Sequence, residues 1–459
     1  RSGPGPGRGQ RRRRHGPGRD GPGKTHRPAP RDRETAPQQP PTAGSPTPLL
    51  EATPTPGLSR PTATPSPTPQ PTLQSLTATL AVSPTPSLVP TVAVQSKCSA
   101  AEPLRVEESL LLRGLVFGPH FWDENTRTWV EQTWILGQEG FRAPALILDD
   151  LEDLGLVDIS PNRAWLAYID FLAEDENSTI MKVKLLNPRT LEEKERVFES
   201  RAPLVSFGEW VNDATFLVAT TAAGEMYEWI LWEPFTDQEQ TVTLELTGMG
   251  RALEIFHTVP VLDPTLSLVV YPCDRHQCGG AEYQVKSLTT GESLWAIDFQ
   301  TSDPLRNRPI WSPDGRFLAV FVSEAFNLNH LLQIYDRAGT LVYNLALPKA
   351  GISLTWAPDS QRLAFFRTVP DPVEEVVRVL TYLELQDGGI YDLCLTDAAG
   401  AYPIVCSPDS TKLAINAQLE YAKNSHALLS IVDIDTGEIV QVYQTEWHRL
   451  KGWVKPIGE

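Results

Sequence analysis

The chain has 459 residues and a formal net charge of −17 at pH 7. Of its 41 prolines, 21 lie in the first hundred residues, whereas all 12 tryptophans follow them, so only the later part can build a hydrophobic core. Residues 1–34 carry a charge of +8, which leaves −25 for the remainder and argues against nucleic acid as a partner, because phosphates would be repelled.

The first hundred residues divide into two low-complexity segments. Residues 1–35 are rich in Gly, Pro and Arg and predict a disordered basic tail. Their formal match to a phosphate-binding loop at 18–25 is discounted, because Gly/Pro-rich flanks cannot form the strand and helix that such a loop needs. Residues 36–103 are rich in Pro, Thr and Ser and predict an extended linker; they resemble the stalks that hold surface domains away from a bacterial envelope, with plain disorder as the alternative.

From residue 104 to residue 459 we expect one folded domain, in which a short phrase recurs. Residues 309–322 (PIWSPDGRFLAVFV) read as an apolar strand, a turn at the Pro-Asp-Gly of 313–315, and a second apolar strand. The copies are spaced by roughly 50 residues, a period that indicates a repeat architecture. They align on six positions: Pro161, Asn212, Pro264, Pro313, Pro358 and Pro408.

Each unit predicts four short antiparallel strands, which is typical of a β-propeller blade. The turn phrase joins the first two strands, and a variable loop leads to a hairpin of strands three and four, as in 331–347 and 429–444. Residues 108–150 predict three more strands without the phrase, and Trp453 near the C-terminus falls where a first strand would begin a blade. We therefore expect seven blades, the last strand completing the blade begun by 108–150. Six blades, with 105–150 packed outside the ring, is the alternative.

Two residue types keep their place in the repeat. Four tryptophans share one position: Trp210, Trp311, Trp356 and Trp453. We expect them to pack between neighbouring blades rather than to line a ligand site. Three aspartates share the turn: Asp314, Asp359 and Asp409. We expect these carboxylates to accept hydrogen bonds within their own turns rather than to bind a cation.

The order W-S-P-D-G-x-x-L-A-F, followed by a strand pair with D-x-x-T-G, resembles the WD40-like repeats of TolB-type β-propellers. The best copies lie in 309–347, 352–366 and 406–444, while Asn212 replaces the turn proline in one unit and 263–265 lacks the Asp-Gly in another. The resemblance implies an extracytoplasmic bacterial binding propeller, which is secreted, periplasmic or on the cell surface. It supplies no catalytic residue, because the repeated residues are structural.

The segments between the second and third strands are long and varied, which suits recognition. They cover residues 170–179, 273–280, 323–329, 369–375 and 418–426. Seven residues in them are candidate binding residues: Glu174, Asp175, Glu176, Arg275, His276, Glu374 and Glu375. The two acidic groups among them favour a basic partner.

The cysteines suggest disulfides rather than a metal site. Cys273 and Cys278 flank one loop with His276, but no second Cys/His pair follows at a spacing suited to zinc, so we expect a disulfide. Cys394 and Cys406 fall on the last strand of one unit and the first of the next, where a second disulfide could form. Such bridges would agree with an oxidising compartment; in a cytosolic protein all five cysteines would be reduced.

We therefore expect a monomeric scaffold that binds a protein, peptide or glycan on its loop face, without a cofactor, a metal or a membrane-spanning segment. No apolar run approaches the roughly 18 residues that span a bilayer. The chain begins at Arg1 and contains no signal-peptide segment. Two alternatives stay open. One is a hydrolase, a glycosidase or lactonase, with carboxylates in the central channel, although no catalytic motif is found. The other is a sensor or spacer domain of a larger, truncated protein.

Overall fold

A computed structural model divides the chain into two units, Arg1–Val82 and Ser83–Glu459. All residues that the structure describes lie in the second unit; they are 94–97, 104–105, 113–123, 128–137, 146–148, 155–174, 178–202, 204–249, 259–274, 276–279, 283–297, 308–323, 330–347, 352–371, 375–397, 403–418, 427–444 and 448–455. The predicted basic tail and most of the predicted linker therefore lie outside the described residues.

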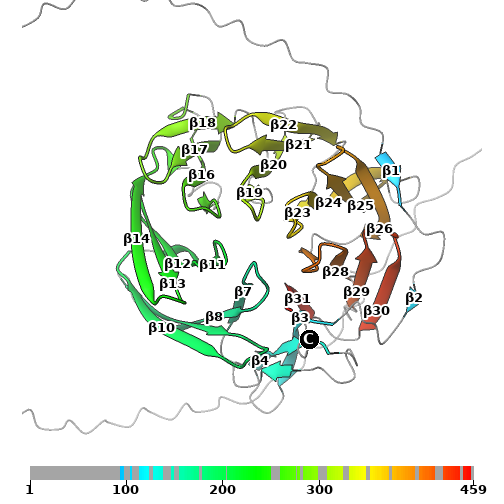
Figure 1. Cartoon of the computed structure of the whole chain (residues 1–459), viewed down its shortest axis with the longest axis horizontal. Coiled ribbons are helices and arrows are strands. Elements are labelled where there is room, and N and C mark those ends of the chain that lie inside the picture. The colour runs from blue at the N-terminus through cyan, green and yellow to red at the C-terminus, as the bar shows by residue number, and fades with distance from the viewer. Residues whose placement is uncertain are drawn as a thin grey trace, which may run out of the picture. The chain divides into compact units, whose positions relative to one another are not determined.

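The described residues form strands, and the strands form seven sheets around one axis, as Figure 1 shows. We number the sheets blades 1 to 7 in chain order. In blades 2, 3, 5 and 6, whose first and fourth strands are labelled, the first strand lies nearer the axis than the fourth. The predicted all-β propeller with seven blades is therefore confirmed, and the alternative of six blades is wrong.

Six blades are continuous in the sequence. Blade 2 consists of β7 (Gly155–Ile159), β8 (Leu166–Glu174), β9 (Thr179–Leu186) and β10 (Glu193–Ser200). Blade 3 consists of β11 (Leu204–Trp210), β12 (Phe216–Ala223), β13 (Met226–Glu233) and β14 (Gln238–Glu245). Blade 4 consists of β15 (Val261–Leu262), β16 (Leu268–Pro272), β17 (Tyr283–Ser287) and β18 (Ser293–Ile297). Blade 5 consists of β19 (Ile310–Trp311), β20 (Phe317–Ser323), β21 (His330–Asp336) and β22 (Leu341–Leu347). Blade 6 consists of β23 (Ile352–Trp356), β24 (Arg362–Asp371), β25 (Glu375–Glu384) and β26 (Ile390–Asp397). Blade 7 consists of β27 (Ile404–Cys406), β28 (Lys412–Gln418), β29 (Ala427–Asp433) and β30 (Ile439–Gln444).

Blade 1 combines strands from both ends of the domain. Its inner strand is β31 (His448–Trp453), followed by β3 (Leu115–Asp123), β5 (Thr133–Ile135) and β6 (Leu146–Leu148), while β4 (Thr128–Glu131) pairs with the far end of β3. β31 runs antiparallel to β3 with Trp453 opposite Leu115. The predicted closure is confirmed, and it leaves no gap between the first and last blades where a sheet edge would be exposed.

Two short strands lie on the outside of the last two blades. β1 (Val94–Ser96) pairs in parallel with β26 of blade 6, and β2 (Leu104–Arg105) pairs in parallel with β30 of blade 7. The Lys97 ammonium lies 4.5 Å from the ring centre of Tyr391 and 5.2 Å from that of Tyr382, so a cation–π contact reinforces the first pairing. β1 falls in the stretch that the sequence assigns to the linker.

The turn phrase is held by its own polar side chains. In blade 5 the Ser312 hydroxyl donates to the Asp314 carboxylate at 2.7 Å, and the same carboxylate oxygen accepts the Arg316 N–H at 3.0 Å. Asp359 and Asp409 accept the N–H two residues further on in the same way, at 2.8 and 3.1 Å. The predicted role of these aspartates is confirmed.

The turns are also linked from blade to blade. The Asp314 N–H donates to the Ser360 hydroxyl of blade 6 at 3.1 Å, and the Asp359 N–H donates to the Ser410 hydroxyl of blade 7 at 3.0 Å. In blade 3, the Asn212 side chain accepts the Thr215 N–H of its own turn at 2.8 Å and donates to the Pro264 carbonyl of blade 4 at 2.7 Å. At the position of the turn proline, Asn212 therefore supplies both a hydrogen bond within its own turn and a hydrogen bond to the next blade.

The repeated tryptophans fill the spaces between blades, as predicted. All four are 2–8% exposed. Trp356 of blade 6 packs with Ala319 and Phe321 of blade 5, and its indole N–H donates to the Ile310 carbonyl at 3.2 Å. The domain thus has one apolar cluster at each junction of blades rather than a single central core.

A close approach of blades 2 and 3 requires glycine at position 208, where φ is +68°. A Cβ atom there would lie 2.5 Å from Ile169 Cδ1 and 3.0 Å from Val157 Cγ2. Gly224 has nearly the same φ, +65°, but open space around it. In urea unfolding, Gly208→Ala is expected to cost about 2–4 kcal/mol and Gly224→Ala only about 1 kcal/mol, because only the former adds a clash to the backbone strain. Equal costs would contradict this packing.

Candidate functional site

The structure places only part of the seven predicted binding residues. Asp175, Glu176, Arg275 and Glu374 lie outside the described residues. Glu174 ends β8 and Glu375 begins β25, and their side chains are not among those described. His276 is exposed. Strands extend further into two segments than predicted: β8 covers 170–174 and β24 covers 369–371, because their hairpins continue the antiparallel pairing towards the loop.

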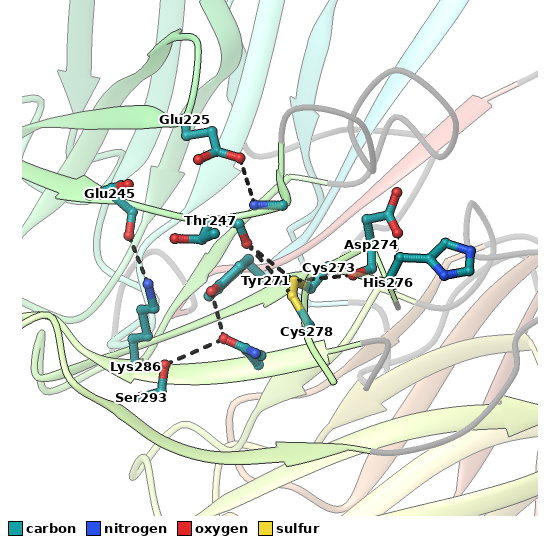
Figure 2. The surroundings of a disulfide bond; sticks show 12 residues. Glu225, Glu245, Thr247, Tyr271, Cys273, Asp274, His276, Cys278, Lys286 and Ser293 are labelled. Carbon is teal, nitrogen blue, oxygen red and sulfur yellow. Dashed lines mark hydrogen bonds between the residues drawn. A yellow bond between two sulfur atoms is a disulfide. The ribbon is translucent and has the colours of Figure 1, made fainter. Parts of the chain in front are cut away.

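Blade 4 carries a disulfide between Cys273 and Cys278 on the loop side of the ring. Figure 2 shows its surroundings, with Glu225 and Thr247 beside the loop. The Gly248 N–H donates to the Glu225 carboxylate at 2.9 Å, and the Asp274 N–H donates to the Gly248 carbonyl at 3.3 Å. The His276 ring points away from the two sulfur atoms. The disulfide therefore closes the loop on itself and leaves His276 on the surface, while hydrogen bonds to Thr247 and Gly248 link the loop to the segment that follows β14.

A second disulfide, from Cys394 to Cys406, is not formed: Cys406 is a buried free thiol. The two residues are near in sequence but belong to the fourth strand of blade 6 and the innermost strand of blade 7. Three strand spacings of roughly 4.8 Å separate such positions, far beyond the roughly 7 Å that a disulfide allows between Cα atoms. The Cys406 thiol packs among Leu413, Ile404 and Ala357 instead, and burial raises its pKa to about 12.

An exposed apolar patch lies where blades 2 and 3 meet. It consists of Phe171 and Leu172 of β8 and Phe207 of β11, which are 44%, 51% and 44% exposed; we call it the apolar patch. The rings of Phe171 and Phe207 meet edge to face with 5.0 Å between their centres. Phe171 and Leu172 lie in the half of β8 that leads to the loop, away from the turn phrase. Directly before Phe171 on β8, the Asp170 carboxylate forms an ion pair with the Lys182 ammonium of β9, with 3.8 Å between Oδ2 and Nζ.

Local irregularities lie next to the patch in both strands. The pairing of β8 with β9 shifts between Phe171 and Ala173, and that of β11 with β12 shifts between Leu204 and Ser206. Such β-bulges insert one residue and redirect the side chains next to it. Phe171 falls in the predicted segment 170–179, yet it is not among the predicted binding residues, because a phenylalanine beside a strand predicts burial rather than exposure.

Three ionisable residues gather at the inner strands. The Arg308 guanidinium, just before β19 of blade 5, forms two hydrogen bonds with the Glu209 carboxylate of blade 3, at 2.9 and 3.1 Å. The ion pair therefore spans blade 4, whose inner strand has only two residues. The Asp158 carboxylate of blade 2 accepts the Ile159 N–H at 2.8 Å and the Trp210 N–H at 2.6 Å.

The inner position changes the acidity of Asp158. Removal from water raises the pKa of this carboxyl to about 7, and the negative charge of Glu209 adds to the rise, whereas the two N–H donors and Arg163 oppose it. The Arg308 pKa is raised instead: burial lowers it, but the Glu209 carboxylate outweighs that loss. Asp158 therefore exchanges its proton near neutral pH, close to the ion pair between Arg308 and Glu209.

Two features are absent from the described residues. No group of three or more His, Cys, Asp or Glu side chains is arranged to hold a metal ion in this part of the chain. Over the same residues, no helix long and apolar enough to cross a membrane was found.

Comparison with known proteins yields similarity of structure only. No family model and no curated protein matches the chain. The β-propeller domain of the Trilobed protease from Pyrococcus furiosus matches with a TM-score of 0.47 and 12% identity, covering 75% of this chain and 97% of that chain. Oligogalacturonate lyase from Vibrio parahaemolyticus matches with a TM-score of 0.43 and 11% identity, covering 72% and 85%. A functionally unknown protein from Desulfotomaculum acetoxidans has the same TM-score and identity, covering 74% and 98%. Similarities at this level transfer neither activity nor ligand, so the assignment of the chain as a seven-bladed β-propeller rests on its own sheet topology.

Proposed function

We propose that this protein is a binding propeller that recognises a peptide segment of a partner protein through the apolar patch. The observation that carries the proposal is the exposure of three large apolar side chains on two neighbouring blades, two of them already in ring contact. Aromatic side chains of this kind act as anchors in protein recognition. The turns on the opposite side have satisfied their polar groups within the scaffold and offer little to a partner.

The charge of the domain supports a partner with basic residues beside its apolar anchors. Outside residues 1–34 the chain carries −25, and such a field attracts cationic segments and accelerates their encounter. Affinity is therefore expected to fall as salt is added, while the apolar contribution persists. The resemblance of the repeat to TolB-type propellers supports the same role, the binding of a partner.

Selection from a random peptide library on the immobilised full chain tests the proposal. We expect enriched peptides to carry aromatic or aliphatic anchors, and calorimetry to show at least a tenfold loss of affinity for Phe171→Ser combined with Phe207→Ser, about 1.4 kcal/mol or more. Leu191→Ser is the matched control, since Leu191 is a 64% exposed apolar residue in the turn between β9 and β10, at the end of the blade opposite its loop.

Two results would speak against a peptide-binding patch. One is equal loss of affinity in the Leu191→Ser control. The other is failure to enrich any peptide while an array of glycans binds the wild type, which would replace a peptide partner by a glycan.

An extracytoplasmic location belongs to the same proposal. The disulfide between Cys273 and Cys278 supports it, because structural disulfides persist in oxidising compartments. A role as the sensor or spacer domain of a longer protein is compatible with the same binding surface.

A hydrolase with carboxylates at the axis is the second candidate. It is favoured by one observation, the raised pKa of Asp158 close to a second carboxylate, Glu209. Both carboxylates are engaged, however: Asp158 accepts two backbone N–H groups and Glu209 is held by Arg308. Hydrolysis of aryl glycosides or lactones by the wild type, lost in Asp158→Asn and Glu209→Gln, would establish this candidate.

A further inference from the structure

One arginine near the axis has no acceptor for its side chain. Arg163 lies in the turn after β7, where its φ is +61°, and its backbone carbonyl accepts the Lys455 N–H at 2.9 Å. Its Nε–H is shielded from solvent and has no hydrogen-bond partner. Within the described part of the chain, its guanidinium donates no hydrogen bond to any other group either. Buried donors without an acceptor are uncommon and call for an explanation.

The surroundings of Arg163 come from three blades. The Cβ position of Gly452, on β31 of blade 1, lies 3.7 Å from Nη1, an ordinary contact distance, so the guanidinium lies beside this strand. The Cys406 thiol of blade 7 and the Asp158 carboxylate of blade 2 are near enough to affect it electrostatically, yet neither forms a hydrogen bond with it. Asp158 is the natural internal partner, but its two oxygens already accept the Ile159 and Trp210 N–H groups.

The position is also unusual within the repeat. The residues with positive φ in the corresponding turns of blades 5 to 7 are Gly315, Ser360 and Ser410, and the two serines bind the turn of the preceding blade. Blade 2 follows blade 1, whose inner strand β31 and second strand β3 come from opposite ends of the domain and are not joined by a turn phrase. An arginine therefore stands where the chain of turn-to-turn bonds is interrupted, and its long side chain reaches the junction of blades 1, 2 and 7.

We propose that Arg163 forms the core of a binding site for a small oxyanion, a carboxylate or phosphate group, at the closure of the ring. The guanidinium matches two oxygen atoms of such a group in a fork of parallel N–H donors. Burial lowers the Arg163 pKa but leaves the side chain charged. An anionic ligand would therefore compensate the partial loss of hydration of this cation. This site is separate from the apolar patch and does not depend on the proposed peptide binding.

Titration of the full chain with sodium acetate or sodium phosphate tests the site, with sodium chloride at matched ionic strength as the reference. We expect a saturable rise in Tm and a calorimetric signal with at least one of the two oxyanions, because a ligand that binds only the folded state stabilises it. A response to acetate alone identifies a carboxylate site, and a response to phosphate alone identifies a phosphate site. In Arg163→Gln the affinity is expected to fall at least tenfold.

Two further variants complete the test. Arg316→Gln removes an exposed arginine from the turn of blade 5 and is expected to bind the oxyanion as the wild type does. Arg163→Lys keeps the charge but lacks the paired N–H donors of the guanidinium, so its affinity for the oxyanion is expected to be at least threefold lower than that of the wild type. If Arg163→Gln does not fold, Arg163→Lys tests the site in its place. Equal responses of the wild type and the folded Arg163 variant, or no response beyond that to chloride, would overturn the site.

Discussion

Trp453→Ala is expected to lower the free energy of unfolding by about 3–5 kcal/mol, the usual cost of removing a large aromatic side chain from a packed core. Trp453 is 2% exposed and packs with Leu115 and Phe117 of β3 and with Leu429 and Ile431 of blade 7. It therefore holds the C-terminal strand to the first blade and the first blade to the last. Chemical denaturation followed by tryptophan fluorescence and circular dichroism measures the change.

Trp295→Ala is the control for the closure. Trp295 lies on the outer strand β18 and is only partly buried, so its removal is expected to cost less than 3 kcal/mol. Deletion of 445–459, which removes β31 entirely, should abolish the single cooperative transition, because blade 1 then lacks its inner strand. If Trp453→Ala costs no more than Trp295→Ala, the closure contributes less to stability than the packing indicates.

The second large effect is a pH dependence of stability that arises from Asp158. Its pKa is raised from 3.8 to about 7 in the folded state, so the folded protein binds a proton that the unfolded chain has released. Stability contributed by this group is therefore full at low pH and falls as the pH rises from about 4 to about 7, the reverse of an ion-paired carboxylate. The total loss is at most about 4 kcal/mol, and about 2–3 kcal/mol of it falls between pH 5 and pH 8.

Comparison of the wild type with Asp158→Asn isolates this contribution from the other titrations. The stability of Asp158→Asn relative to the wild type should rise by about 2–3 kcal/mol from pH 5 to pH 8, whatever its constant offset. Asp237→Asn, which removes an exposed carboxylate from a turn of blade 3, is the control for the loss of a carboxylate elsewhere. A constant difference between Asp158→Asn and the wild type over this range would mean that the Asp158 carboxyl stays ionised in the folded protein.

The features that the sequence predicted well are those decided by neighbouring residues. The Ser-Pro-Asp turn forms bonds over two to five residues, so each copy specifies its own strand–turn–strand unit wherever it lies in the chain. Repetition of that unit gave the number of blades, and Trp453 gave the closure because it repeats a position already seen in three other units. The Cys273–Cys278 disulfide likewise joins residues only five positions apart.

The error over Cys394 and Cys406 has a geometric cause. Twelve positions separate them in the sequence, but consecutive blades place the end of one unit on the outside and the start of the next at the axis. Residues on the fourth strand of one unit and the first strand of the next are therefore near in sequence but far apart in space.

The amino-acid sequence by itself determined the repeat, the blade, the turn and the closing strand, because local hydrogen bonds and the alternation of apolar residues are encoded within each unit. The tertiary structure alone decided that Phe171 faces solvent, that Glu209 and Arg308, 99 residues apart, pair across blade 4, and that Arg163 is left without an acceptor. These contacts depend on which blades face each other around the axis, and no single unit of the sequence contains that information.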